Sequence, residues 1–120
     1  MFLHLNHQKL DVYNFSRAFV LECYKIVKTF PLDEKFILNA QIRRAAISVH
    51  LNISEGASRK SINERKRFYE IARGSLIEVD AAFDISSDLN YCSKKEIEQL
   101  GFLMTKCFKM LSGLIESCKN

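Results

Sequence analysis

Five polar side chains recur every three or four residues between positions 41 and 55, namely Gln41, Arg44, Ser48, Asn52 and Glu55. On a helix this spacing places them along one side, so they are the first candidates for a catalytic site. A serine nucleophile needs a general base within reach, but His50 would point more than a quarter-turn away from Ser48. Glu55 would be a weak base because Arg44 favours its charged form. We therefore expect a structural polar network, in which Arg44, Asn52 and Glu55 satisfy one another and fix the helix register.

Other patterns that could support chemistry are weak. Gly56 is followed by Ala-Ser-Arg, which does not match a phosphate-binding loop. His4 and His7 are three residues apart but have no carboxylate pair that would complete a metal site. The cysteines form no C-x-x-C pair, and we expect reduced thiols at Cys23, Cys92, Cys107 and Cys118. The sequence thus predicts no catalytic residue, no metal and no cofactor.

The positive charge of the chain is concentrated in one segment. The formal net charge is +4, and residues 43–73 hold eight basic residues against three acidic ones. Positive side chains at the start of a helix cost roughly a few tenths of a kcal/mol each, so helix stability does not explain their position. The candidate nucleic-acid-binding residues are Arg59, Lys60, Arg65, Lys66, Arg67 and Arg73. Contacts with the phosphates of a polyanion would explain the cluster, and a solvated basic face is the alternative.

Four helices are expected to position these residues. The chain has 120 residues with one proline and four glycines, which disfavours an all-β fold because such folds need many tight turns. Pro31, Gly56 and Asn90 are expected to end helices. Two Ser-x-x-Glu capping boxes, at 61–64 and 93–96, are expected to begin them. We predict a single all-α domain over residues 1–120, an antiparallel up-down four-helix bundle with helices at 8–29, 33–55, 62–89 and 94–117.

The predicted helix at 33–55 carries two apolar faces. One is expected to line the core, with Leu38, Ile42, Ala45, Ala46, Val49 and Ile53. The nearly opposite face holds Phe36, Ile37, Ala40, Ile47 and Leu51, and the next helix carries Gly74, Ile77 and Ala81 outside its core stripe. In the first helix, Tyr13, Val20, Tyr24 and Val27 also lie outside the main stripe. Because a bundle helix in a monomer needs one stripe, we expect contacts between copies of the chain. A fully enclosed helix in a monomer is the alternative.

Two stretches of the sequence resemble a known bacterial family. The first is Gln-Ile-Arg-Arg-Ala-Ala-Ile-Ser-Val at 41–49, followed by Asn-Ile-Ser-Glu-Gly at 52–56 and Arg59. The second is Phe-Tyr-Glu-Ile-Ala-Arg-Gly-Ser at 68–75, followed by Glu78. With Phe30, Pro31 and Glu34, they resemble the four-helix-bundle family related to the intervening-sequence protein, which insertions in large-subunit ribosomal RNA genes encode. The similarity covers about residues 8–115.

This resemblance implies an up-down four-helix bundle that assembles as a homopentamer, and no catalytic activity is established for the family. Relatives include the accessory variability determinant of diversity-generating retroelements, a basic pentamer that binds nucleic acid and a reverse transcriptase. The implied partners are therefore further copies of the chain, RNA or DNA, and a protein such as a reverse transcriptase. Three positions depart from the family pattern: Tyr13, His50 and Asn90 stand where the family often has tryptophan, proline and glycine.

The function expected first is that of a non-enzymatic, oligomeric nucleic-acid-binding or accessory protein that uses its basic surface. The alternative is a protein-binding scaffold, in which the charge only keeps the particle soluble. A small hydrolase or metal enzyme fits the residues least well. The N-terminus lacks a signal-peptide pattern, and no apolar run approaches the ~20 residues that a membrane span needs, so we expect a cytoplasmic protein without a membrane partner.

Overall fold

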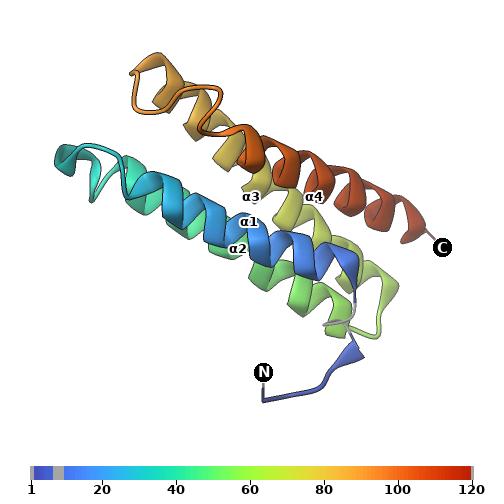
Figure 1. Cartoon of the computed structure of the whole chain (residues 1–120). Helices are drawn as coiled ribbons and strands as arrows, with labels where there is room; N and C mark the ends of the chain where they lie inside the picture. Colours follow the sequence, from blue (N-terminus) through green and yellow to red (C-terminus); the bar gives the residue numbers. More distant parts are fainter. Residues whose placement is uncertain (1, 7–9, 120) are drawn as a thin grey trace.

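The computed structural model describes residues 2–6 and 10–119, and within them the chain is all-α (Figure 1). Four long helices make up the fold, and no strand occurs in the described residues. A short 3₁₀ turn, η2 (Leu32–Glu34), lies between the first two helices. The helices are α1 (Asp11–Val27), α2 (Leu38–Ser58), α3 (Ile62–Asp88) and α4 (Glu98–Ser117).

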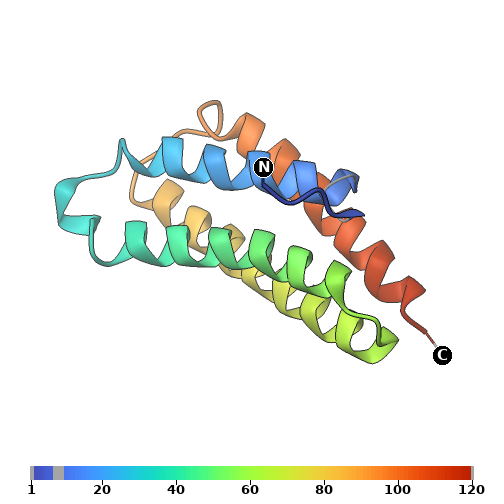
Figure 2. The ribbon, with the colours of Figure 1, turned by 90° about the horizontal axis from the view of Figure 1, so that it is seen from below.

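Each helix packs against two others around one hydrophobic core. Helix α2 contacts α1 and α3, helix α4 contacts the same two, and the α2–α3 contact is the most extensive. The connection at 59–61 lies at one end of the group, and the connections at 28–37 and 89–97 lie at the other (Figures 1 and 2). All four helices contribute fully buried side chains, which include Phe19, Ile42, Ile53, Leu76, Leu100 and Leu111.

Helix α2 differs from its predicted bounds at both ends. Residues 32–34 form the 3₁₀ turn, and the helix begins only at Leu38, after Ile37 leaves the helical region with φ −115° and ψ −88°. At the other end the helix continues to Ser58, so the prediction that Gly56 ends it is wrong. Gly56 has no positive φ and is buried inside the helix. A Cβ atom at this position would lie 2.9 Å from Cε1 of Tyr69, so a glycine lets α2 and α3 approach closely.

The predicted N-cap residue and left-handed end residue of α3 are confirmed, while the 61–64 capping box forms one of its two hydrogen bonds among the described residues. The Ser61 hydroxyl accepts a hydrogen bond from the Glu64 amide at 3.3 Å, which satisfies one of the unpaired amides at the helix start. At the other end Asn90 adopts φ 63°, the left-handed conformation. The Asn90 amide donates to the carbonyl of Ser87 and the Tyr91 amide to that of Ser86, as in a Schellman motif.

The second capping box forms, but it does not start α4. The Ser93 amide donates to Oε1 of Glu96, and the Glu96 amide donates to the Ser93 hydroxyl. These bonds close a turn over residues 94–97, and α4 begins at Glu98 instead of residue 94. Helix α1 is likewise shorter than predicted, running from Asp11 to Val27, while residues 8 and 9 lie outside the described residues.

The burial pattern confirms the inner face of α2 and corrects several other assignments. In α2, Ile42, Ala45, Ala46, Val49 and Ile53 are buried. The first helix does not have a second apolar face of the predicted extent, because Tyr13 and Val27 are buried within the chain. Ile71 and Phe108 are exposed, whereas Tyr69 and Leu103 are buried.

Candidate functional site

The polar residues of α2 do not form one network. Those in the middle of the helix make hydrogen bonds with serine side chains. Asn52 Nδ2 donates to the carbonyl of Ser48 at 2.8 Å and to the Ser48 hydroxyl at 3.0 Å. The Ser48 hydroxyl also lies 2.9 Å from that of Ser75 on α3. Ser75 is buried, and these bonds satisfy hydroxyl and amide groups at the α2–α3 contact. We call the five polar residues of α2 the polar ladder, namely Gln41, Arg44, Ser48, Asn52 and Glu55. The middle part of the ladder therefore links two helices.

The start of the ladder is exposed and loosely bonded. Gln41 Nε2 donates to Oε2 of Glu78 on α3 at 3.4 Å. Arg44 Nη1 donates to Oε1 of Gln41 at 3.5 Å. Both distances are at the long end of the hydrogen-bond range, so these contacts contribute little rigidity.

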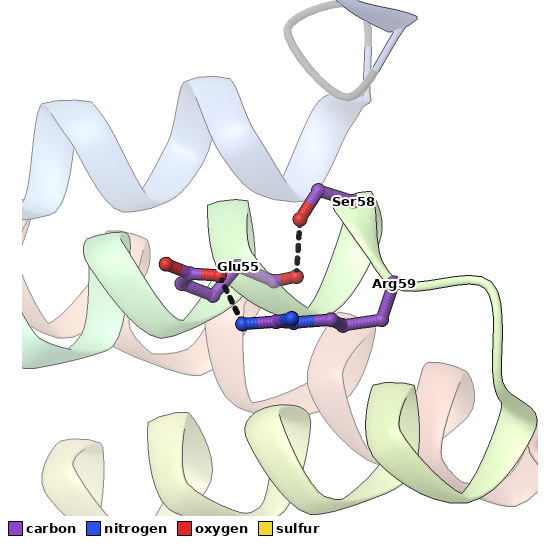
Figure 3. Close-up of polar contacts among 3 residues, drawn as sticks. All are labelled: Glu55, Ser58 and Arg59. Carbon is purple, nitrogen blue, oxygen red and sulfur yellow. Dashed lines mark hydrogen bonds and ion pairs between the residues drawn. The ribbon is translucent and has the colours of Figure 1, made fainter.

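The end of the ladder forms a local ion pair, which Figure 3 shows. Arg59 Nη2 donates to Oε2 of Glu55 at 3.0 Å, and the Ser58 hydroxyl donates to the Glu55 carbonyl at 2.7 Å. The guanidinium of Arg59 also lies over the Phe68 ring, 5.0 Å from its centroid. The predicted mutual satisfaction of Arg44, Asn52 and Glu55 is therefore wrong, because each of the three bonds to a different partner.

A serine–histidine contact does occur, but between helices, where spacing along the chain could not predict it. The Ser16 hydroxyl lies 2.7 Å from Nδ1 of His50, and it also donates to the carbonyl of Tyr13 at 3.0 Å. A hydroxyl has one hydrogen, so a Ser16 that donates to the Tyr13 carbonyl accepts its second bond from Nδ1 of His50. Ser16 is fully buried, so a substrate cannot reach its hydroxyl. The pair therefore joins α1 to α2 and is not a nucleophile with its base.

The six candidate nucleic-acid-binding residues lie in and after the 59–61 connection. Three of them are engaged within the chain. Arg59 pairs with Glu55, Arg65 Nη1 donates to the carbonyls of Arg59 and Lys60, and Arg73 Nη1 donates to the Ser112 hydroxyl of α4. Arg65 thus holds the connection in place, and Arg73 joins α3 to α4.

The other three candidates are Lys60, Lys66 and Arg67. The side chains of these three residues make no hydrogen bond or ion pair with another described residue, and Lys60 and Arg67 are exposed. Lys66 lies near the end of α4, where the Lys119 ammonium bonds to Glu116 and, with a weaker effect from Lys66, lowers the pKa of that carboxyl. The unengaged cations therefore gather at the end of the molecule that holds the 59–61 connection (Figure 1).

The cysteines are poor candidates for reactive thiols. All four are free and buried. Burial raises the pKa of Cys107 to about 12 and also raises the pKa of Cys23 strongly, so neither is a thiolate near neutral pH. The described residues contain no group of three or more histidine, cysteine or acidic side chains arranged for a metal ion, and His7 lies outside those residues. None of the described helices combines the length and apolar character needed to cross a bilayer.

The candidate oligomer contacts are mostly exposed within one chain. Phe36 is 83% exposed, and Ile37, Ile47, Leu51, Ile77, Gly74 and Ala81 are also exposed, while Ala40 is half-buried. Gly74 has no atom within 4 Å of the place its Cβ would occupy, so no neighbouring helix of the same chain explains a glycine there. Beside Ile77, a groove of about 300 Å³ opens between α3 and α4.

Residues 8–113 match the model of a family described as 23S rRNA-intervening sequence protein. No curated protein sequence matches the chain. A crystal structure of a protein with unknown function from the S23 ribosomal protein family of Bacteroides thetaiotaomicron VPI-5482 has the same fold, with a TM-score of 0.77. The two chains are 21% identical, and the match covers 87% of this chain and 97% of that one. Because the family model spans nearly the whole sequence, this chain belongs to the 23S rRNA-intervening sequence protein family.

Proposed function

We propose that the protein is a non-enzymatic, homo-oligomeric accessory protein that binds nucleic acid through the basic surface formed by residues 59–73. One observation carries this proposal: the side chains of Lys60, Lys66 and Arg67 have no hydrogen-bonding or ion-pairing partner among the described residues, although they crowd the start of α3. Cations at a helix N-terminus oppose the helix dipole, so an external anion would remove an unfavourable interaction there. A polyanion backbone offers several phosphates at once.

The proposal divides the basic surface by role. Lys60, Lys66 and Arg67 bind phosphates, whereas Arg59 and Arg65 shape the connection that presents them. Arg73 has its guanidinium committed to Ser112 and contributes mainly long-range attraction. The alternative proposal, a protein-binding scaffold without a nucleic-acid role, is favoured by the exposed apolar residues on α2 and α3.

The proposal also includes the antiparallel up-down order of the helices and their assembly into a ring of identical chains. Exposed Phe36 before α2, Leu51 on α2 and Ile77 on α3 support assembly, because large apolar patches left open to solvent mark interaction surfaces. The number five comes from the resemblance alone. A ring would repeat the basic surface once per chain and raise the overall affinity for a long polyanion. A protein partner such as a reverse transcriptase stays a prediction.

The test is an electrophoretic shift assay with RNA and DNA across a salt series. We compare the wild type with a K60E/K66E/R67E variant and with a matched K28E/K94E/K95E variant, whose exposed lysines lie at the other end of the molecule. We expect the first variant to lose at least tenfold in affinity and to show a shallower salt dependence, and the second to bind within about threefold of wild type. Equal binding by both variants, or no binding by the wild type at low salt, would refute the nucleic-acid role. Stoichiometric copurification of one protein without nucleic acid would favour the scaffold.

A further inference from the structure

Two parts of the exposed apolar surface differ in the charge beside them. The first is the α2 face, which we define as Ile47 and Leu51 with Arg43 and Arg44. Leu51 is 56% exposed, and it follows Ile47 by four residues, so the two lie on one side of the helix. Arg43 is one turn before Ile47 on the same side, and Arg44 is two turns before Leu51. Neither arginine forms an ion pair with a described residue.

The second part is the α3–α4 groove, whose apolar lining includes Ile77, Met104 and Phe108. Ile77 is 54% exposed, and Phe108 is exposed on the facing helix. The groove has a volume of about 300 Å³ and is open to solvent, which is the lower limit for a small-molecule pocket. Its size and apolar lining fit aliphatic side chains of another protein.

Acidic residues dominate α3 beside this groove. Residues 74–93 contain Glu78, Asp80, Asp84 and Asp88 and neither lysine nor arginine. None of these acids forms an ion pair with a described residue. Asp80 lines the groove and Asp84 follows it by one turn, while Lys109 of α4 lies on the opposite wall. The α3 wall of the groove therefore carries one carboxylate, Asp80, with Asp84 one turn beyond it, and the α2 face has two arginines without an ion pair. These charges are opposite in sign, whereas Lys109 on the α4 wall has the same sign as the arginines.

We propose that the α2 face of one copy of the chain docks into the α3–α4 groove of a second copy. Ile47 and Leu51 would cover Ile77 and Phe108, and Arg43 and Arg44 would reach Asp80 and Asp84. This inference rests on the proposed homo-oligomer and assigns the surfaces that join its subunits. Charges of opposite sign at the edge of an apolar contact fix its register and exclude wrong pairings.

The α2 face and the α3–α4 groove are two different surfaces on different helices, so a contact between them is heterologous. Each copy then offers one α2 face and one groove, and every added copy leaves one of each open until a ring closes. In such a ring all chains point the same way along the ring axis. The basic ends, with Lys60 and Arg67, would therefore collect on one face of the ring.

The test uses the full chain with one contact surface removed at a time. Leu51→Asp removes the α2 face, Ile77→Asp removes the groove, and Leu21→Asp is the control, since Leu21 is 64% exposed on α1 outside both parts. We expect the first two variants to be monomers of 13.9 kDa by analytical ultracentrifugation at micromolar concentration. Leu21→Asp should keep the wild-type mass. Far-UV circular dichroism establishes that each variant is folded.

Mixing the two variants then distinguishes a heterologous contact from other kinds of contact between subunits. A 1:1 mixture of L51D and I77D should form a dimer and nothing larger, because one intact face and one intact groove remain. Charge reversal gives a second readout: R43E/R44E and D80K/D84K should each lose the oligomer, and a chain with all four changes should regain it. Assembled L51D and I77D, or a mixture that stays monomeric, would overturn the proposed contact.

These outcomes are separate from those of the proposed function. A wild type that is already monomeric refutes the homo-oligomer and this contact together. An assembled wild type whose two variants also stay assembled refutes the contact alone. Nucleic-acid binding is measured on the K60E/K66E/R67E variant, which changes neither the α2 face nor the groove, so loss of binding with an unchanged mass leaves the contact standing.

Discussion

The ring of Tyr69 on α3 occupies the space that a side chain at position 56 of α2 would need. A Cβ built at Gly56 lies 2.9 Å from Cε1 of Tyr69 and 3.1 Å from Cβ of Phe68. Both contacts are closer than carbon atoms tolerate without movement. The most extensive helix contact of the fold therefore depends on a residue without a side chain.

Gly56→Ala should destabilise the protein by about 1 kcal/mol, because the cost of overpacking exceeds the gain in helix propensity. Gly101→Ala is the matched control. Nothing lies within 4 Å of its added Cβ, so it should stabilise α4 by about 0.5–1 kcal/mol. Urea unfolding of the two variants and the wild type measures both effects. Equal stabilisation by the two substitutions would show that α2 and α3 are not as close as described.

The part-buried Ser16–His50 bond should couple α1 to α2. Ser16→Ala and His50→Phe should each cost about 0.5–1.5 kcal/mol, since each removes one hydrogen bond between the two helices. In a double-mutant cycle the pair should show a coupling energy of about 0.5–3 kcal/mol. Strictly additive losses would contradict a direct bond. The same variants should leave nucleic-acid binding unchanged, because the bond lies outside the basic surface.

The buried thiols should make the fold less stable at high pH. A cysteine thiol in the unfolded chain has a pKa of about 8.5, and burial in the folded state raises the pKa of Cys107 to about 12. The raised pKa belongs to the folded state, so its contribution is complete below about pH 8 and is lost as pH rises toward 12. We expect the free energy of unfolding to fall by roughly 1 kcal/mol per pH unit for each such thiol above about pH 9.

Urea titrations at pH 7.5, 9 and 10 measure this slope. Cys107→Ala should reduce it while also lowering stability at every pH. A Cys107→Ala slope equal to that of the wild type would assign the alkaline loss to other groups. In addition, Cys107 should not react with a thiol reagent at pH 8 unless the chain is unfolded.

Asn90 is expected to tolerate glycine and no ordinary side chain. Its φ of 63° is accessible to glycine and asparagine, whereas for other residues this conformation is less favourable by about 1–2 kcal/mol. Asn90→Gly should therefore leave the melting temperature unchanged or raise it slightly, and Asn90→Ala should lower it by several degrees. Differential scanning calorimetry distinguishes the two. A neutral Asn90→Ala would mean that the end of α3 unwinds at no cost.

Local signals in the sequence predicted much of the fold. The errors arose where a residue far away in the sequence determines the local conformation or the bonding partner. The Ser61 cap and the left-handed Asn90 depend on neighbours within a few positions, so their patterns are readable. Gly56 was misread as a helix end because the Tyr69 ring that it accommodates is thirteen positions away. The Ser16–His50 bond was missed for the same reason, since the two residues are 34 positions apart.

For the candidate sites, residue type and periodicity indicated which side chains would be exposed but not their partners. The outer apolar residues of α2 and α3 were found by counting turns, and they are exposed as that count requires. Whether Arg59, Arg65 and Arg73 are engaged within the chain depends on Glu55, on two carbonyls and on Ser112. Such pairings depend on which residues lie close together in the folded chain, and the spacing of residues along one helix does not predict this.

Helix α3 carries cations in its first turns and carboxylates in its last ones, so its side-chain charges add to the backbone dipole instead of cancelling it. An isolated peptide of residues 62–88 should therefore be a poor helix, held straight in the protein only by its neighbours. The same alignment gives α3 an electric moment along its axis, with the positive end at the 59–61 connection. An approaching anionic strand would be turned toward one tip before any contact forms, and this orientation would fade as added salt shortens the reach of the field.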